Sequence, residues 1–206
     1  MLPSAGMAGP GWADELRSQL AASARLLRQT AEQASLLADV AGLINQHLQD
    51  GRKILLCGNG GSAADAQHIA TELMARYKRD RKALPALALG TDVSFVTAMS
   101  NDHGYERVLA REVEALGAAG DVLWAFSTSG NSPNVLAAVE QARSQELATI
   151  GFTGADGGRL HCLVDVSFRV PSKDTPRIQE VHMAVAHIIC DLIEQAFSQA
   201  EEPAGA

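Results

Sequence analysis

Apolar residues recur at three- and four-residue steps along the first quarter of the chain, from Trp12 to Gln49. This spacing is typical of amphipathic helices, and it predicts two helices with a break near Thr30–Ala34. The apolar stripe is wider than the flank of one small domain requires. We therefore expect residues 11–50 to form helices that bring copies of the chain together. Residues 1–10, rich in Pro, Gly and Ala, are expected to be disordered.

Beyond residue 50, short apolar runs alternate with helical patterns. The runs have the length of buried strands, and they are Ile54–Cys57, Pro85–Leu89, Val122–Phe126, Ala148–Phe152 and Val164–Val170. The predicted helices are Ser62–Tyr77, Asp92–Met99, Tyr105–Leu116, Pro133–Gln145 and Arg177–Phe197. The charged segment Lys78–Lys82 is predicted to be a solvated loop. Alternating strands and helices imply parallel βαβ units with right-handed crossovers.

The predicted fold class is therefore α/β. Residues 51–198 are expected to form one three-layer, doubly wound domain around a five-stranded parallel sheet, and the helices of residues 11–50 form an N-terminal extension. In such sheets a ligand binds beyond the carboxyl ends of the strands, where the strand order reverses. The residues that follow the strands are thus the first place to look for a site.

Two glycine- and serine-rich turns follow the first and third predicted strands. The first reads Gly58-Asn-Gly-Gly-Ser62, and Ser62 with Asp65 three residues later is predicted to cap the next helix. The second carries four hydroxyls, on Ser127, Thr128, Ser129 and Ser132. Unpaired N–H groups at a helix start attract anions. Capping by one serine explains one hydroxyl but not four, so the second turn predicts a phosphate monoester site.

A dinucleotide is the alternative anion. Residues 58–63 match the pattern G-x-G-x-x-[GA] of dinucleotide-binding folds. That fold also requires an acidic residue about 20 positions further on, to hold a ribose. The first candidate, Asp92, lies more than 30 residues beyond Gly58. The pattern therefore favours a sugar phosphate.

Titratable residues lie close to the first turn. His68 and Glu72 are four residues apart and so share a helix face, a spacing that suits two metal ligands or an acid/base pair. On the last helix, spacing alone does not choose between His182 and His187 as their partner. Arg76, one turn beyond Glu72, could bind a phosphate or cap its helix.

Composition narrows the function classes. The chain has 206 residues, 47% of them hydrophobic, and a formal net charge of −7, which argues against partners such as nucleic acid or an anionic membrane. No apolar run is long enough to span a membrane, and the N-terminus lacks the features of a secretory signal. Cys57, Cys162 and Cys190 are odd in number and widely spaced, which predicts buried free thiols in the cytoplasm. Cys57 could be a nucleophile, but a strand position points it into the core.

Five segments resemble the SIS (sugar isomerase) family: CGNGGSAADAQHIATEL, SNDHG, AFSTSGNSPNV, GFTGADGG and RIQEVHMAVAH. They occur in the family's order and spacing, and the resemblance covers roughly residues 12–198. Within the family, CGNGGS together with STSGNS is most similar to the isomerases of seven-carbon sugar phosphates. The resemblance implies interconversion of sedoheptulose 7-phosphate and D-glycero-D-manno-heptose 7-phosphate, the first step towards nucleotide-activated heptose for products such as lipopolysaccharide. It also implies a homotetramer with active sites at subunit interfaces and one zinc ion per subunit.

The resemblance also implies roles for single residues. The metal ligands would be His68, Glu72, Gln179 and His187, and the acid/base pair would be Glu72 and His187. The substrate contacts would be Asn59, Gly60, Gly61, Ser62, Glu72, Asn101, Asp102, Ser127, Thr128, Ser129, Ser132 and Gln179. Thr71 and Pro176 stand where some relatives carry acidic residues.

Two other functions stay open beside the heptose-phosphate isomerase. Non-catalytic SIS paralogues bind the bacterial replication initiator, but they have lost the residues at the positions of Glu72 and His187. Both residues are intact here, which favours an enzyme. An isomerase of a five- or six-carbon sugar phosphate is the third possibility. In either enzyme, Glu72 could take the carbon-bound proton and His187 could move a proton between the two oxygens. A carboxylate bound to zinc is a poorer base, so the roles of Glu72 partly conflict.

Overall fold

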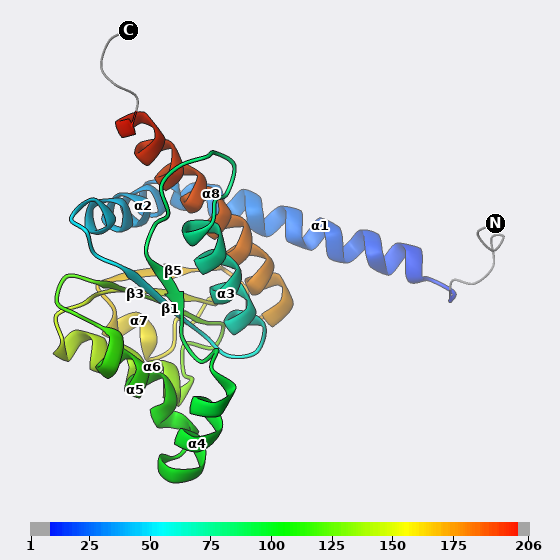
Figure 1. The fold of residues 1–206 in the computed structure, drawn as a ribbon. Coiled ribbons are helices and arrows are strands. Elements are labelled where there is room, and N and C mark those ends of the chain that lie inside the picture. The colour runs from blue at the N-terminus through cyan, green and yellow to red at the C-terminus, as the bar shows by residue number, and fades with distance from the viewer. Residues whose placement is uncertain (1–8, 202–206) are drawn as a thin grey trace, which may run out of the picture.

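Five parallel strands form the centre of the computed structural model, which describes residues 9–201 (Figure 1). They are β1 (Ile54–Cys57), β2 (Ala86–Ala88), β3 (Val122–Ser127), β4 (Ala148–Thr153) and β5 (Val166–Arg169). The strand order is β2-β1-β3-β4-β5, so the direction of winding reverses between β1 and β3. The predicted parallel, doubly wound sheet is confirmed, and the reversal lies between the two strands that precede the glycine and serine turns.

The helices cover both faces of this sheet. They are α1 (Trp12–Thr30), η1 (Ala31–Gln33), α2 (Ala34–Gln49), α3 (Gly61–Met74), α4 (Val93–His103), η2 (Tyr105–Arg107), α5 (Val108–Leu116), α6 (Pro133–Ser144), α7 (Leu160–Leu163) and α8 (Thr175–Glu201). Successive strand residues point to opposite faces. Ile54 and Leu56 pack with α2, α3 and α8, whereas Leu55 and Cys57 pack with α5, α6 and α7. The result is the expected three-layer arrangement.

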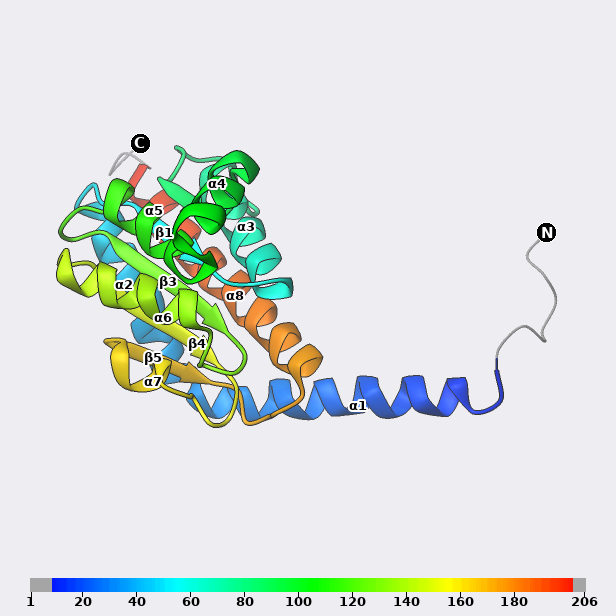
Figure 2. The ribbon, with the colours of Figure 1, turned by 90° about the horizontal axis from the view of Figure 1, so that it is seen from below.

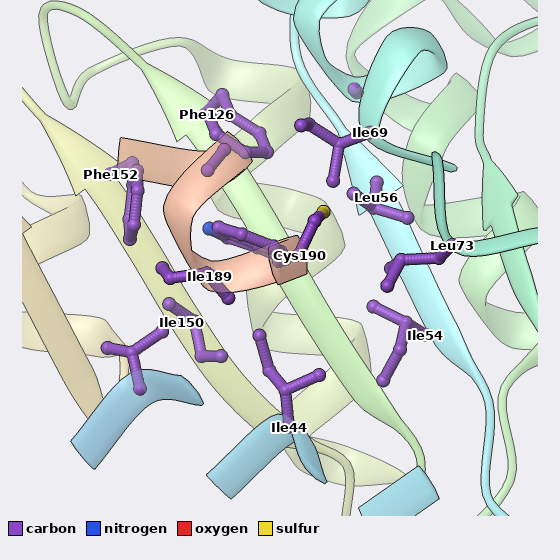
Figure 3. Packing of buried hydrophobic residues seen from close by; sticks show 14 of the residues in the cluster. Ile44, Ile54, Leu56, Ile69, Leu73, Phe126, Ile150, Phe152, Ile189 and Cys190 are labelled. Carbon is purple, nitrogen blue, oxygen red and sulfur yellow. The ribbon is translucent and has the colours of Figure 1, made fainter. Parts of the chain in front are cut away.

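Buried side chains from distant parts of the chain meet on the first of these faces (Figure 3). Ile44 from α2 and Cys190 from α8 lie over the aromatic rings and aliphatic side chains of the strands. Burial raises the pKa of Cys57 and of Cys190 to about 12, so neither thiol is a nucleophile at neutral pH. Cys162 is exposed, contrary to the prediction that all three cysteines are buried, because it lies on the outer side of the short helix α7.

The N-terminal helices break where predicted, at Ala31–Gln33. Helix α1 extends away from the body of the molecule as an arm (Figure 2). Its middle is held against α8, since Arg177 donates to Ser23 Oγ over 2.7 Å and to Gln19 O over 3.0 Å. Helix α2, by contrast, buries Val40 and Ile44 in the main core. The predicted disorder of residues 1–10 falls mostly outside the described residues. No helix in the described part of the chain is long and apolar enough to cross a membrane.

Two local predictions are wrong, and a third holds only in part. Helix α3 begins at Gly61 with Gly60 as its N-cap, so Ser62 lies inside the helix and does not form the predicted cap with Asp65. The helix also ends at Met74, before the predicted Tyr77. The charged segment 78–82 forms a loop in which Lys78, Asp80 and Lys82 are exposed as predicted, but the side chain of Arg81 is only 1% exposed and lies against α8. The described structure also contains the short helix α7, which the sequence pattern did not indicate.

His182 is a core histidine. It is fully buried among the rings of Phe126, Phe152 and Phe168, and its Nε2 lies 3.2 Å from Thr153 O. Burial lowers its pKa from 6.5 to about 4, and the bond to Thr153 opposes this only in part. The ring is therefore neutral in the folded protein at neutral pH.

This burial predicts an acid-sensitive stability. As the pH falls below 6.5, His182 becomes protonated in the unfolded chain. In the folded chain it stays neutral until about pH 4. The free energy of unfolding should therefore fall over this range by up to about 3 kcal/mol from this residue. Urea unfolding at pH 7, 5.5 and 4.5 measures the slope, and the variant His182→Phe should lose this contribution. Equal pH slopes in the two proteins would contradict the assignment.

Candidate active site

A glycine turn, Gly58–Gly61, joins β1 to α3 and forms one side of the candidate site. Gly60 has a φ of +55°, a left-handed conformation that favours glycine. A Cβ atom on Gly61 would lie 2.6 Å from Nε2 of Gln179, so this glycine allows α8 to approach the turn closely. Gln179 Nε2 donates to Ser62 Oγ over 3.4 Å. The first turn of α3 is therefore packed against α8 through a polar contact.

Asn59 connects the glycine turn to α6. Its amide exchanges two hydrogen bonds of 2.8 Å with the amide of Asn134, which is only 2% exposed. The hydroxyl of Tyr105 donates to Asn59 Oδ1 over 2.9 Å. A cavity of about 340 Å³ is lined by Asn59, Tyr105, Glu106, Ser132, Pro133 and Asn134. The two turns therefore border one cavity at the carboxyl edge of the sheet.

The serine turn, residues 127–132, runs from β3 to α6. Ser127 Oγ and Ser132 Oγ lie 3.2 Å apart, and the side chain of Ser132 makes no capping bond to α6. The loop after β4 supports the turn, because Gly154 N donates to Thr128 O and Leu160 N donates to Gly130 O. Capping by one serine therefore does not account for these hydroxyls. Their role in holding a phosphate stays a prediction.

Two imidazole rings and a carboxylate meet between α3 and α8. His68 Nε2 lies 2.9 Å from His187 Nε2 and 3.1 Å from Glu72 Oε1. One ligand atom from each of the three residues lies within 4.8 Å of the other two. The choice between the two histidines of α8 is thus decided, since His187 reaches this cluster while His182 faces the core.

The sequence profile of the SIS domain matches residues 20–154, a range that includes α3 and both turns. The chain belongs to the SIS domain family. A phosphoheptose isomerase of Roseiflexus sp. is 53% identical to this SIS domain protein over 178 residues, which cover 86% of the chain and 90% of that relative. The resemblance found in the sequence is confirmed.

Two solved structures of phosphoheptose isomerases share the fold of this chain. The phosphoheptose isomerase of Neisseria gonorrhoeae superposes with a TM-score of 0.84 at 42% identity, covering 89% of this chain and 99% of that one. The phosphoheptose isomerase of Francisella tularensis superposes with a TM-score of 0.86 at 37% identity, covering 89% and 98%. Within the SIS domain family, the chain therefore groups with the phosphoheptose isomerases.

The cluster of His68, Glu72 and His187 suits a divalent metal such as zinc. Catalytic zinc binds three protein nitrogen or oxygen atoms at about 2.0–2.2 Å and keeps one position open. Tetrahedral ligands at such lengths lie about 3.3 Å apart, close to the separations found here. Two neutral imidazole nitrogens that face each other can share only one proton, whereas both can donate a lone pair to a metal. The donor set therefore fits the metal that the family implies.

His187 is neutral at physiological pH. Burial lowers its pKa, and the neighbouring His68 lowers it further, while Glu72 acts in the opposite direction. A neutral imidazole can accept a proton at one nitrogen and donate one at the other. Glu72 lies beside it with a side chain that is 19% exposed. The two groups can therefore handle different protons of one substrate.

The hydrogen bonds of other predicted site residues lie outside this cluster. Gln179 contacts the glycine turn, and its role as a metal ligand stays a prediction. Asn101 and Asp102 are exposed near the end of α4, where Asn101 Nδ2 donates to Asp102 Oδ1 over 2.8 Å. Their link to the site is Tyr105, which follows within four residues and bonds to the glycine turn. Arg76 is exposed just beyond α3, and its contact with phosphate stays a prediction.

The sequence patterns did not indicate the roles of four neighbours of the site, among them Tyr77, whose ring stacks on that of His187. Asn134 directly follows Pro133 in the serine-turn motif, so its position in that motif was the available signal. Tyr105 and Tyr77 gave no signal beyond their aromatic character. Asp65 was assigned to a cap, but its Oδ2 is buried without a hydrogen-bond partner, and burial raises its pKa to about 6 against the opposing effect of His68.

Proposed function

We propose that this SIS domain protein is a ketose/aldose phosphate isomerase that interconverts sedoheptulose 7-phosphate and D-glycero-D-manno-heptose 7-phosphate. The observation that carries the proposal is the meeting of Glu72 and His187 beside His68, in a chain 53% identical to a phosphoheptose isomerase. The non-catalytic alternative is not favoured, because a protein that only binds a partner does not require this acid/base pair.

The reaction moves a carbonyl between C1 and C2 of the sugar through a cis-enediol. The serine turn would hold the phosphate, and Asn59, Gly60, Gly61 and Ser62 would contact the sugar chain. Glu72 would remove the carbon-bound proton and return it to the neighbouring carbon, a role that typically contributes 10²–10⁴-fold. His187, being neutral, would move a proton between the two oxygens.

A zinc ion held by His68, Glu72 and His187, with Gln179 as a further ligand, would supply a Lewis acid that polarises the substrate carbonyl. The fit of the donor atoms supports this proposal. We also place the enzyme in the cytoplasm, since free thiols at Cys57, Cys162 and Cys190 suit a reducing compartment. Its aldose phosphate product would feed the synthesis of nucleotide-activated heptose, including that of lipopolysaccharide.

The decisive test is incubation with sedoheptulose 7-phosphate, with and without a chelator, followed by NMR of the sugar carbons. We expect the heptose aldose to form, and its formation to slow after chelation. If the protein converted a five- or six-carbon sugar phosphate faster than sedoheptulose 7-phosphate, that smaller sugar phosphate would be assigned as the substrate. Absence of conversion of any sugar phosphate by metal-loaded protein would reject the enzyme.

Self-association is the second part of the proposal. Helix α1 leaves Trp12, Leu16 and Leu20 more than 60% exposed along the arm in Figure 2. Exposed apolar surface of this kind is typical of an interface between proteins. We propose that these arms assemble a homotetramer, with active sites that are completed at the subunit contacts.

The arm makes the assembly testable. A double variant, Leu16→Asp with Leu20→Asp, should reduce the mass measured by light scattering at micromolar concentration from that of four chains. Glu15→Gln with Gln19→Glu, on the same helix, changes exposed polar residues and should leave the mass unchanged. A wild-type chain that stays monomeric would contradict the proposal.

A further inference from the structure

One buried carboxylate holds the segment between α3 and β2. Glu194 of α8 is fully buried, and its two oxygens accept three consecutive backbone N–H groups. Oε1 accepts from Tyr77 N over 2.8 Å, and Oε2 accepts from Lys78 N over 2.7 Å and from Arg79 N over 2.8 Å. Burial alone would raise the pKa of Glu194, but these bonds outweigh it and lower the pKa. The side chain is therefore an anion surrounded by donors.

A second contact links the carboxylate of Glu194 to helix α3, which carries Glu72. Arg81 is buried, and its Nε lies 3.4 Å from Glu194 Oε1, an ion pair without a hydrogen bond at that nitrogen. Arg81 Nη2 donates to the backbone O of Glu72 over 2.9 Å. One buried ion pair thus joins the turn of α3 that carries Glu72 to α8.

The segment held in this way places an aromatic ring on a site residue. The rings of Tyr77 and His187 are stacked, with centroids 5.4 Å apart and planes at 17°. The ring of His187 also makes an edge contact with the ring of His68, with centroids 5.0 Å apart and planes at 73°. Glu194 and His187 lie seven residues apart on α8, and so on one helix face. The helix that carries His187 therefore also fixes the tyrosine that covers it.

We propose that Tyr77 is a positioning residue for His187 and that Glu194 holds it in place; the inference rests on the proposed function of His187. A stacked ring limits rotation of the imidazole and keeps its Nε2 directed at His68 and Glu72. Small displacements of a catalytic group have large kinetic costs, up to about 10²-fold for 1 Å. In the proposed reaction, Tyr77 does not contact the carbons or oxygens of the substrate that exchange protons. Its replacement should therefore lower kcat and change KM little.

The first test compares Tyr77→Leu with Tyr77→Phe in the full-length protein. We expect Tyr77→Leu to lower kcat by about 10-fold or more while KM for sedoheptulose 7-phosphate changes by less than about 3-fold. Tyr77→Phe keeps the ring and should restore kcat to within about 2-fold of wild type. Equal losses in both variants, or wild-type kcat in Tyr77→Leu, would overturn the proposal.

Two carboxylates of α8 give a matched second pair. Asp191 binds the side chains of Arg79 and Lys78 from outside, over 2.6 and 3.3 Å, whereas Glu194 binds the backbone of the same segment. Glu194→Gln should therefore lower kcat as Tyr77→Leu does, and Asp191→Asn should leave kcat unchanged. If both variants kept wild-type kcat while thermal melting showed them folded, Glu194 would have no positioning role.

A readout independent of turnover separates this inference from the proposed function. In wild type and Tyr77→Phe, the ring protons of His187 should show a ring-current shift in the NMR spectrum that Tyr77→Leu loses. Titration with Zn²⁺ alone should give an affinity at least several-fold weaker in Tyr77→Leu. If wild type were inactive on every sugar phosphate but both changes occurred, the function would fail and the positioning would stand. Unchanged His187 signals and zinc affinity would reject the positioning.

Discussion

Replacing Glu72 by glutamine is expected to lower kcat for sedoheptulose 7-phosphate by about 10³-fold or more. An amide cannot accept the carbon-bound proton, and it is also a poorer metal ligand than a carboxylate. Glu72 stands 3.1 Å from His68, within the cluster that His187 completes. No second carboxylate shares this cluster among the described residues, so none can replace it directly. The initial rate measured by NMR or by a coupled assay gives the effect.

The variant should still bind its substrate, because the phosphate and most of the sugar chain contact the two turns rather than Glu72. Equilibrium titration with sedoheptulose 7-phosphate checks this point. Glu114→Gln is the matched control, since Glu114 is an exposed glutamate on α5 whose side chain pairs with Arg111. It should react at the wild-type rate. Turnover by Glu72→Gln at the wild-type rate would remove the proposed base.

The sequence predicted the sheet and the turns well because their signals are local. Each strand is a short apolar run, and glycine or small polar residues follow β1 and β3 directly. Parallel pairing then brings the strand ends to one edge, with Cys57 opposite Ala125 and Ser127 opposite Thr153. Local patterns, together with the rule that parallel strands end at the same edge of a sheet, therefore predict that the two turns lie close to each other.

Helical spacing also predicted two of the three members of the cluster of His68, Glu72 and His187. His68 and Glu72 lie on the same helix, so their separation of four residues was sufficient. The third member was not accessible in this way, because the rotation of α8 depends on its packing. In the structure, the aromatic side chains of the sheet surround His182, and His187 is turned towards α3. The family resemblance supplied the choice that spacing could not.

The segment 78–82 shows what local patterns cannot show. Five consecutive charged residues are typical of a solvated loop, and that was the prediction. The partner that buries Arg81 and holds the backbone is Glu194, more than 110 residues further along the chain. The pair of Asn59 and Asn134 spans 75 residues in the same way. Such contacts are set by tertiary structure, and no window of sequence contains both partners.

Gly130→Ala is expected to disrupt the serine turn and with it the binding of the phosphate. Gly130 has a φ of +65°, and a Cβ atom there would lie 2.0 Å from Gly157 O and 2.5 Å from Gly157 C. These are backbone atoms that cannot move aside as a flexible side chain would. We expect KM for sedoheptulose 7-phosphate to rise at least about 10-fold, an apparent loss of about 1.4 kcal/mol in binding, together with a clear fall in the melting temperature.

Two other glycines separate the causes of this effect. Gly51 has a φ of +76° but nothing within 4 Å of an added Cβ, so Gly51→Ala measures the cost of the backbone conformation alone, about 1–2 kcal/mol. Gly42 lies in α2 with open space and an ordinary φ, and Gly42→Ala should stabilise the protein by about 0.5–1 kcal/mol. The melting temperature should be highest for Gly42→Ala, lower for Gly51→Ala and lowest for Gly130→Ala. If Gly130→Ala lost no more than Gly51→Ala and kept the wild-type KM, close backbone packing would not be what shapes the phosphate turn.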